Sequence, residues 1–182
     1  ILLTSPDNLP RRDRGVSFAV FKDLKTAQTM KRITAFGDSI MGGIVLDRID
    51  EQASPRYSIL QDSFSNRCQS TLDIEIKNHG RFGNTTCRGL RELERWQEHV
   101  TTSEFVVLEF GGNDCDHSWR QIADDPDGEH HPITSLERFE EQYRQMIAKV
   151  RELGSKPVLL SLPPIIADRY FDMFTRSMDT AR

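Results

Sequence analysis

Three short apolar runs in this sequence each end in a loop that is rich in glycine and polar residues. Runs of this length are typical of buried strands, and the glycines permit sharp turns after them. Open α/β sheets bind ligands at the carboxyl ends of their parallel strands, so loops in these positions meet at one edge. We therefore expect a hydroxyl, a backbone N–H and a side-chain amide at one rim. The three loops are Gly37-Asp38-Ser39-Ile40, Gly80-Arg81-Phe82-Gly83-Asn84 and Gly111-Gly112-Asn113-Asp114.

The rest of the sequence alternates strand and helix patterns. Apolar runs predict strands at 32–36, 72–76, 105–108 and 157–160. Apolar stripes with helical spacing predict helices at 57–71, 87–100, 132–153 and 170–178. This alternation favours a parallel sheet with right-handed crossovers, covered by helices. Such a sheet normally continues with another helix and strand, so we expect the domain to be C-terminally incomplete.

The helix predicted at 132–153 has the clearest signals of the chain. Thr134 and Glu137 have the spacing of a capping box, and Leu136 begins an apolar stripe. Gly154 suits the position that ends a helix. The helix at 57–71 rests on three apolar residues four positions apart, which are Leu60, Phe64 and Cys68.

Taken together, the three loops resemble the sequence blocks of the GDSL/SGNH hydrolase family of esterases and lipases. Gly37-Asp38-Ser39-Ile40 resembles the first block, Gly83 the second and Gly111-Gly112-Asn113-Asp114 the third, in the family's order and spacing. The resemblance covers the chain from about Met30 onward. It implies the SGNH hydrolase fold, a three-layer α/β/α sandwich with a parallel, flavodoxin-like sheet. It also implies hydrolysis of small carboxylic esters, of short acyl chains or acylated sugars, with no cofactor and no metal.

The resemblance also assigns roles to individual residues. Ser39 would be the nucleophile, and its N–H, the Gly83 N–H and the Asn113 amide would stabilise the oxyanion. The segment is not a Gly-x-Ser-x-Gly elbow, because Met41 replaces the second glycine. Local hydrogen bonding is the favoured interpretation for the two aspartates of these loops. The candidate substrate-binding residues are Asp38, Gly112, Asp114 and His117.

The family's general base has no counterpart, because no Asp-x-x-His follows Asp168. Asp114-Cys115-Asp116-His117 has the right letters but follows the oxyanion block, and His79 is a further candidate to border the pocket. We expect the base to lie beyond Arg182. Two alternatives stay open: a non-catalytic SGNH-like binding domain, and a metal-dependent hydrolase that uses acidic and histidine side chains between Asp114 and His130.

Composition narrows the class of partner. The 182 residues carry a net charge of −4, which favours neither nucleic acid nor an anionic membrane. An odd number of cysteines and no apparent signal peptide favour the cytoplasm. Length predicts one domain. The resemblance places this domain at 30–182, preceded by an N-terminal extension of unknown role at 1–29. We expect a small-molecule ester as partner and leave a homo-oligomer open.

Overall fold

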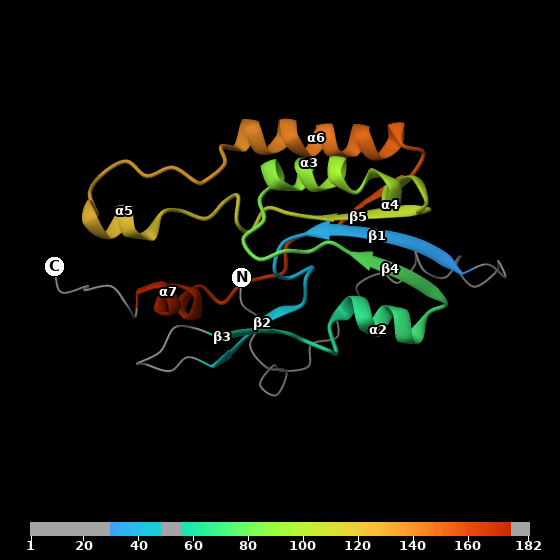
Figure 1. Ribbon diagram of the computed structural model, residues 1–182. Coiled ribbons are helices and arrows are strands. Elements are labelled where there is room, and N and C mark those ends of the chain that lie inside the picture. Colours follow the sequence, from blue (N-terminus) through green and yellow to red (C-terminus); the bar gives the residue numbers. More distant parts are fainter. Residues whose placement is uncertain (1–29, 49–55, 176–182) are drawn as a thin grey trace.

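The computed structural model describes residues 30–48 and 56–175, and the predicted extension at 1–29 lies outside them. A parallel four-stranded sheet forms its centre (Figure 1). Its strands lie in the spatial order β4-β1-β5-β6, which is the flavodoxin-like order when they are counted along the chain. This confirms the predicted fold class. The strands are β1 (Lys31–Gly37), β4 (Ile74–Asn78), β5 (Phe105–Glu109) and β6 (Lys156–Leu159).

Helices cover both faces of the sheet (Figure 1). One face carries α3 (Thr86–Arg95), α4 (Gln97–Thr101) and α6 (Leu136–Glu152), and the other carries α2 (Phe64–Thr71). The apolar stripes of α3 and α6 meet the strands in one hydrophobic core, because a helix buries the side chains that recur on one face. The core residues are Phe36, Leu93, Val100, Val106, Leu108, Phe110, Met146 and Val150.

Strand register places the ends of three strands side by side. Ala35 of β1 pairs with Asn78 of β4, and Gly37 of β1 pairs with Glu109 of β5. The loops that follow these strands therefore leave the sheet at the same edge. Two further helices, α5 (Trp119–Asp124) and α7 (Ala167–Thr175), lie beyond this edge in Figure 1.

The predicted helix at 57–71 is wrong in its first half. The structure has an antiparallel hairpin of β2 (Ile44–Arg48) and β3 (Arg56–Ile59), and α2 begins only at Phe64. The Leu60 N–H donates to the Gly43 carbonyl at 2.8 Å and extends this pairing. The apolar residues four positions apart have the spacing of a helix face. Residues 56–59 nevertheless form a strand, because they pair with β2.

The other differences are in element boundaries. The strand expected at 72–76 occupies Ile74–Asn78, and the helix expected at 87–100 breaks at Trp96 into α3 and α4. Helix α6 begins later than predicted, with Ser135 instead of Thr134 as its cap, since Ser135 accepts from the Arg138 N–H. Leu136 consequently lies outside the core and is 73% exposed. Within the residues that the structure describes, no helix is long and apolar enough to span a bilayer.

Candidate active site

Ser39 lies in a tight turn between β1 and β2. The Asp38 carboxylate accepts the Ile40 N–H at 2.8 Å, and the Ser39 carbonyl accepts the Ile44 N–H at 2.8 Å. A side chain at Gly37 would lie 2.6 Å from Met41 Cβ and 2.7 Å from the Glu109 carbonyl oxygen, so this close approach requires glycine. Ser39 is 3% exposed, and its hydroxyl forms no hydrogen bond with another described residue.

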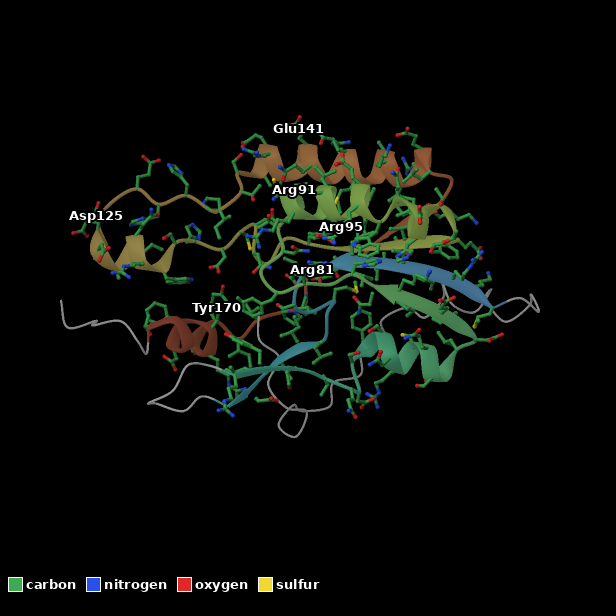
Figure 2. The ribbon with its side chains drawn as sticks, viewed as in Figure 1. Arg81, Arg91, Arg95, Asp125, Glu141 and Tyr170 are labelled. Atoms are coloured by element: carbon green, nitrogen blue, oxygen red, sulfur yellow. The ribbon has the colours of Figure 1, made fainter. Side chains whose placement is uncertain are left out.

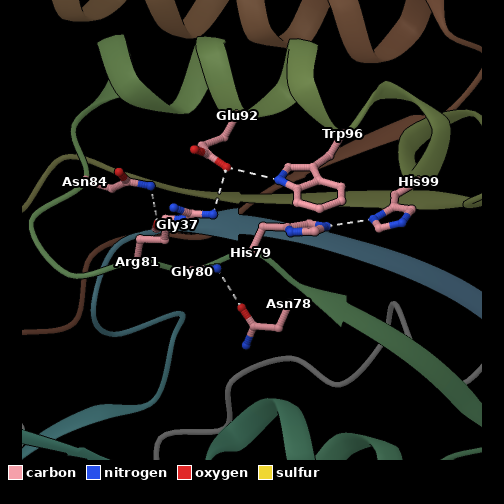
Figure 3. Close-up of polar contacts among 9 residues, drawn as sticks. All are labelled: Gly37, Asn78, His79, Gly80, Arg81, Asn84, Glu92, Trp96 and His99. Carbon is pink, nitrogen blue, oxygen red and sulfur yellow. Dashed lines mark hydrogen bonds and ion pairs between the residues drawn. The ribbon is translucent and has the colours of Figure 1, made fainter.

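The loop after β4 docks onto the end of β1. The Gly37 carbonyl accepts hydrogen bonds from the Arg81 N–H and from the Asn84 side-chain amide, both at 3.2 Å (Figure 3). Gly83 has a φ of +68°, the left-handed region, and open space where a Cβ would be. Among the described residues, no acceptor binds the N–H of Gly83 or that of Ser39. Both remain predicted oxyanion donors.

Asn113, in the loop after β5, connects the other two loops. Its side-chain amide donates to Asp38 Oδ2 at 3.1 Å and to the Asn84 carbonyl at 2.9 Å. The three loops therefore converge, which is the arrangement that the sequence predicts. Both amide hydrogens point at protein acceptors, so donation to an oxyanion requires Asn113 to share one of them.

The two aspartates of these loops are buried and hydrogen-bonded to the backbone and side chains of the loops. Asp38 is 0% exposed, and Asp114 is 2% exposed. The Asp114 carboxylate accepts the Thr86 N–H at 3.1 Å and the Thr86 hydroxyl at 2.6 Å. It thus satisfies a free donor at the start of α3, where the helix dipole favours a negative charge. Their carboxylates hold loops together, which is the local role that turn chemistry favours, and their contact with substrate stays a prediction.

Gly112 and His117 complete the predicted set. Gly112 is buried, and its carbonyl accepts from the Cys115 thiol at 3.4 Å. His117 is half-buried, and its backbone N–H donates to the Asp116 carboxylate at 2.9 Å. Its imidazole forms no hydrogen bond with a described residue, and Asp114 is committed to Thr86. The letters Asp-Cys-Asp-His therefore do not build an Asp–His pair.

His79 packs against an aromatic group on the α3 side of the sheet (Figure 3). Its ring stacks between Phe36 and Trp96, with centroid distances of 5.2 and 4.7 Å, and its Nε2 lies 2.9 Å from His99 Nδ1. Burial lowers the pKa of His79 to about 4, helped by the neighbouring His99. We call this group the imidazole stack (Phe36, His79, Trp96 and His99).

Sequence reasoning missed Glu109, which ends β5 and is 2% exposed. Its carboxyl group faces that of Asp38, and Oε2 accepts the Asp38 N–H at 3.4 Å. Burial, followed by the charge of Asp38, raises the pKa of Glu109 to about 8, and burial also raises the pKa of Asp38. A glutamate that ends an otherwise apolar run is the signal that could have identified it. We call this group the loop network (Gly37, Asp38, Asn84, Glu109, Asn113 and Asp114).

The acidic segment does not assemble a metal site. Within 30–48 and 56–175, no three His, Cys, Asp or Glu side chains gather into a metal-binding group. Asp125 lies at the end of α5, well beyond the sheet (Figure 2). A hollow of about 520 Å³ lies elsewhere, between Leu90 of α3 and the first half of α6. The metal-dependent alternative has no support in this geometry.

Comparisons with solved structures find several that are similar to this chain. The structure is similar to that of a mutant of the esterase AlinE4, with a TM-score of 0.51 and 20% identity over 76% of this chain and 64% of that one. It is also similar to "Crystal Structure of TesA", with a TM-score of 0.48 and 23% identity over 80% and 69% of the two chains. An acetylxylan esterase from Geobacillus stearothermophilus, Axe2, gives a TM-score of 0.44 and 23% identity over 71% and 58%.

The chain thus spans between 58% and 69% of the length of these three structures. At 20% identity, the likeness to the AlinE4 structure shows the fold and nothing more specific. No curated protein sequence gives a match. The sequence pattern of one family, described as GDSL-like lipase/acylhydrolase, matches residues 35–181, which is most of the chain. With the three strand-end loops in place, this chain belongs to the GDSL-like lipase/acylhydrolase family.

Proposed function

We propose that the protein is a serine esterase that cleaves small carboxylic esters, with Ser39 as the nucleophile. The observation that carries this proposal is the pair of hydrogen bonds from the Asn113 amide, which join the Ser39 loop to the Gly83 loop. Acyl transfer by a serine needs a hydroxyl next to donors that stabilise a developing oxyanion. The unengaged N–H groups of Ser39 and Gly83 supply two such donors.

In this proposal the reaction proceeds through an acyl-enzyme. Ser39 Oγ attacks the ester carbonyl and loses its proton to a general base, and the alcohol leaves with a proton returned by that base. Water then attacks the acyl group and releases the acid. No histidine in the described part of the chain bonds to Ser39, so we assign the base to a group outside that part. This proposed scheme uses neither a metal ion nor a cofactor.

Short acyl groups fit the site best. Ser39 is 3% exposed, and the hollow of about 520 Å³ lies over α3 and α6, away from it. A long acyl chain needs an apolar channel, whereas Ser39 lies in a closely packed turn. We therefore propose an acetyl or similarly short acyl group on an alcohol such as a sugar. Three free cysteines, Cys68, Cys87 and Cys115, support a reducing compartment such as the cytoplasm.

The test compares the full-length protein with its Ser39→Ala variant in hydrolysis of an aryl acetate, an aryl ester of a long acyl chain and an acetylated sugar. Loss of the nucleophile should reduce turnover by about 10⁴-fold or more. An organophosphonate should label Ser39 at one equivalent. Ser70→Ala, on the exposed side of α2, is the matched control and should change nothing. Undiminished turnover in Ser39→Ala would exclude the proposal.

One observation favours a second candidate, a non-catalytic binding domain of the same fold. Ser39 is almost fully buried, and no described base contacts it. Such a domain would bind an acylated ligand without turnover. Calorimetry with the acetylated sugar separates the two functions: saturable binding together with no labelling of Ser39 and no acid release favours the binding domain.

A further inference from the structure

Glu109 lies beneath the Ser39 turn, and no cationic side chain of the described residues forms an ion pair with it. It ends β5 opposite Gly37, and a Cβ on Gly37 would lie 2.9 Å from its Oε2. None of the ion pairs formed by described residues involves Glu109 or Asp38. Two buried carboxylates in contact, with no cation between them, cannot both stay ionised. The pair therefore retains one proton.

The hydrogen bonds identify which of the two acids holds that proton. Asp38 accepts the Ile40 N–H at 2.8 Å on Oδ1 and the Asn113 amide at 3.1 Å on Oδ2, so its charged form is stabilised. Glu109 accepts the long 3.4 Å bond from the Asp38 N–H on Oε2, and the Met41 N–H also interacts with its carboxyl group. Its Oε1 is the one fully enclosed side-chain oxygen or nitrogen without a partner among the described residues.

An unpartnered buried carboxylate oxygen destabilises the folded state, because it has lost its hydration without gaining a hydrogen bond. A proton on Glu109 reduces this penalty, because a neutral acid loses less hydration than a carboxylate and its O–H donates to Asp38, its side-chain hydrogen-bond partner. The resulting acid–carboxylate pair resembles the arrangement of two carboxyl groups that share one proton in a buried site. The proton therefore belongs on Glu109, and the charge belongs on Asp38.

From this geometry, and resting on the proposed esterase function, we infer that Glu109 is a positioning residue. As a neutral acid it donates to Asp38, and Asp38 in turn holds both the Ser39 turn and the Asn113 amide. Glu109 itself touches no reacting atom. It acts by fixing the carboxylate that orders the nucleophile's loop and one predicted oxyanion donor.

Among the described residues, the titratable side chains around the pair add no compensating positive charge. Asp114, in the loop after β5, adds a further negative charge that raises the pKa of Asp38. Tyr143 of α6 donates its hydroxyl to the Leu108 carbonyl at 3.2 Å, and burial raises its pKa to about 12, so it stays neutral. Loss of the Glu109 proton would place a second charge below the site where an oxyanion forms. Activity should therefore fall as the pH rises through the pKa of Glu109, about 8.

A purely space-filling role for Glu109 predicts something different. Leucine would fill much of the same volume without a donor, whereas glutamine keeps a neutral donor in the same place. The variants Glu109→Gln and Glu109→Leu therefore separate the two roles. Glu94→Gln, on the exposed side of α3, is the control.

The first readout does not depend on catalysis. In the 182-residue chain with ¹³C-labelled glutamate carboxyl groups, NMR titration from pH 4 to 10 should show one glutamate with a midpoint near 8. Glu109→Gln should remove this signal, and Glu94→Gln should leave it unchanged. Titration of every glutamate near the ordinary pKa of about 4.3 would overturn the inference.

The second readout is the pH profile of ester hydrolysis by the active protein. Glu109→Leu should lower kcat by about 100-fold at nearly constant KM, as misplacement of reacting groups does. Glu109→Gln should retain at least about 10-fold more activity than Glu109→Leu and lose the alkaline decline. Equal losses in both variants, or an alkaline decline that persists in Glu109→Gln, would contradict a positioning role.

The two readouts also separate this inference from the esterase proposal. Ser39-dependent turnover with normal titration of every glutamate would refute the role of Glu109 and leave the esterase intact. Titration near pH 8 without Ser39-dependent turnover would refute the esterase, and with it the positioning role, while the neutral acid would remain. If Glu109→Leu fails to fold, the titration and the pH profile of Glu109→Gln still decide the outcome.

Discussion

The loop network and the imidazole stack each contain a residue that directly follows a strand of the same sheet. The two groups nevertheless have different roles. Asp38 follows β1 and turns toward the loops that carry Ser39 and Asn113. His79 follows β4 and turns toward the aromatic residues of α3 and α4 (Figure 3). A position directly after a strand therefore does not by itself make a residue part of the candidate active site. The contacts of its side chain decide whether it belongs there.

Burial acts on both regions in the same way but with opposite consequences for charge. It favours the neutral form of each group, so it raises the pKa of Glu109 and lowers that of His79. His79 is neutral because it has lost a proton, whereas Glu109 is neutral because it keeps one. The stacked rings stabilise the helix layer, while the acid pair keeps one carboxylate, on Asp38, that orders a turn.

The largest expected effect in this comparison comes from Asp114, which ties the loop network to α3. Asp114→Ala removes the acceptor for the Thr86 N–H and hydroxyl and leaves a buried donor without a partner. The free energy of unfolding should fall by about 3 kcal/mol, measured by urea denaturation. The exposed Asp124→Ala, at the end of α5, should change it by less than about 0.5 kcal/mol. Equal stability of the two variants would show that the network contributes little.

The most damaging substitution in the imidazole stack should lower the free energy of unfolding somewhat less than Asp114→Ala does. Trp96→Ala removes a partly buried ring that stacks on His79 and His99, so we expect a loss of about 2 kcal/mol in the same measurement. Trp96→Phe keeps the stacking and loses only the indole bond to Glu92, and should lose about half as much. If Trp96→Ala also prevents organophosphonate labelling of Ser39 in a folded protein, the two regions are not independent.

The free energy of unfolding should change with pH in opposite directions for the two regions. Folded Glu109 keeps a proton that the unfolded chain has released, so its contribution falls as the pH rises from about 4.5 to about 8. The slope reaches at most about 1.4 kcal/mol per pH unit. Folded His79 has lost a proton that the unfolded chain still holds between about 4 and 6.5, so its contribution rises with pH there.

Urea denaturation at pH 5 to 9 measures these slopes. Above about pH 6.5 only the acid pair of the two regions still titrates, so the wild type should lose stability up to pH 8 while Glu109→Gln stays flat. His79→Gln should remove the rise at acid pH and leave the alkaline part unchanged. A negative alkaline slope that survives in Glu109→Gln would assign it to another group.

The smallest effect on stability is expected at Gly83. Gly83→Ala forces a side chain into a φ of +68° but meets nothing within 4 Å, so it should destabilise the protein by about 1 kcal/mol. Gly154→Ala, at a φ of +86° with equally open space, should show the same loss and serves as the control. Ester hydrolysis should decline more in Gly83→Ala than in Gly154→Ala, because only Gly83 is a predicted oxyanion donor. Equal activities would contradict that role.

Much of the architecture could be predicted, because continuous apolar runs and helical stripes report burial directly. Residues 105–108 and the stripe of Tyr143, Met146 and Val150 lie where their patterns indicate. The β2–β3 hairpin could not be predicted, since the pairing of Ile44 with Ile59 depends on contacts across a connection rather than on local spacing. Glu109 was also missed, because its significance depends on Asp38, a residue 71 positions away.

The sequence by itself determined the family, the parallel sheet and the three loops whose glycines, hydroxyl and amides mark the site. These features follow from local conformational freedom and the periodicity of apolar residues, which are properties of neighbouring positions. Only the tertiary structure decided that Asp38 and Asp114 hold the loops together, that His79 belongs to a ring stack, and that Glu109 faces Asp38. Burial and proton sharing depend on which distant groups meet, and folding alone brings them together.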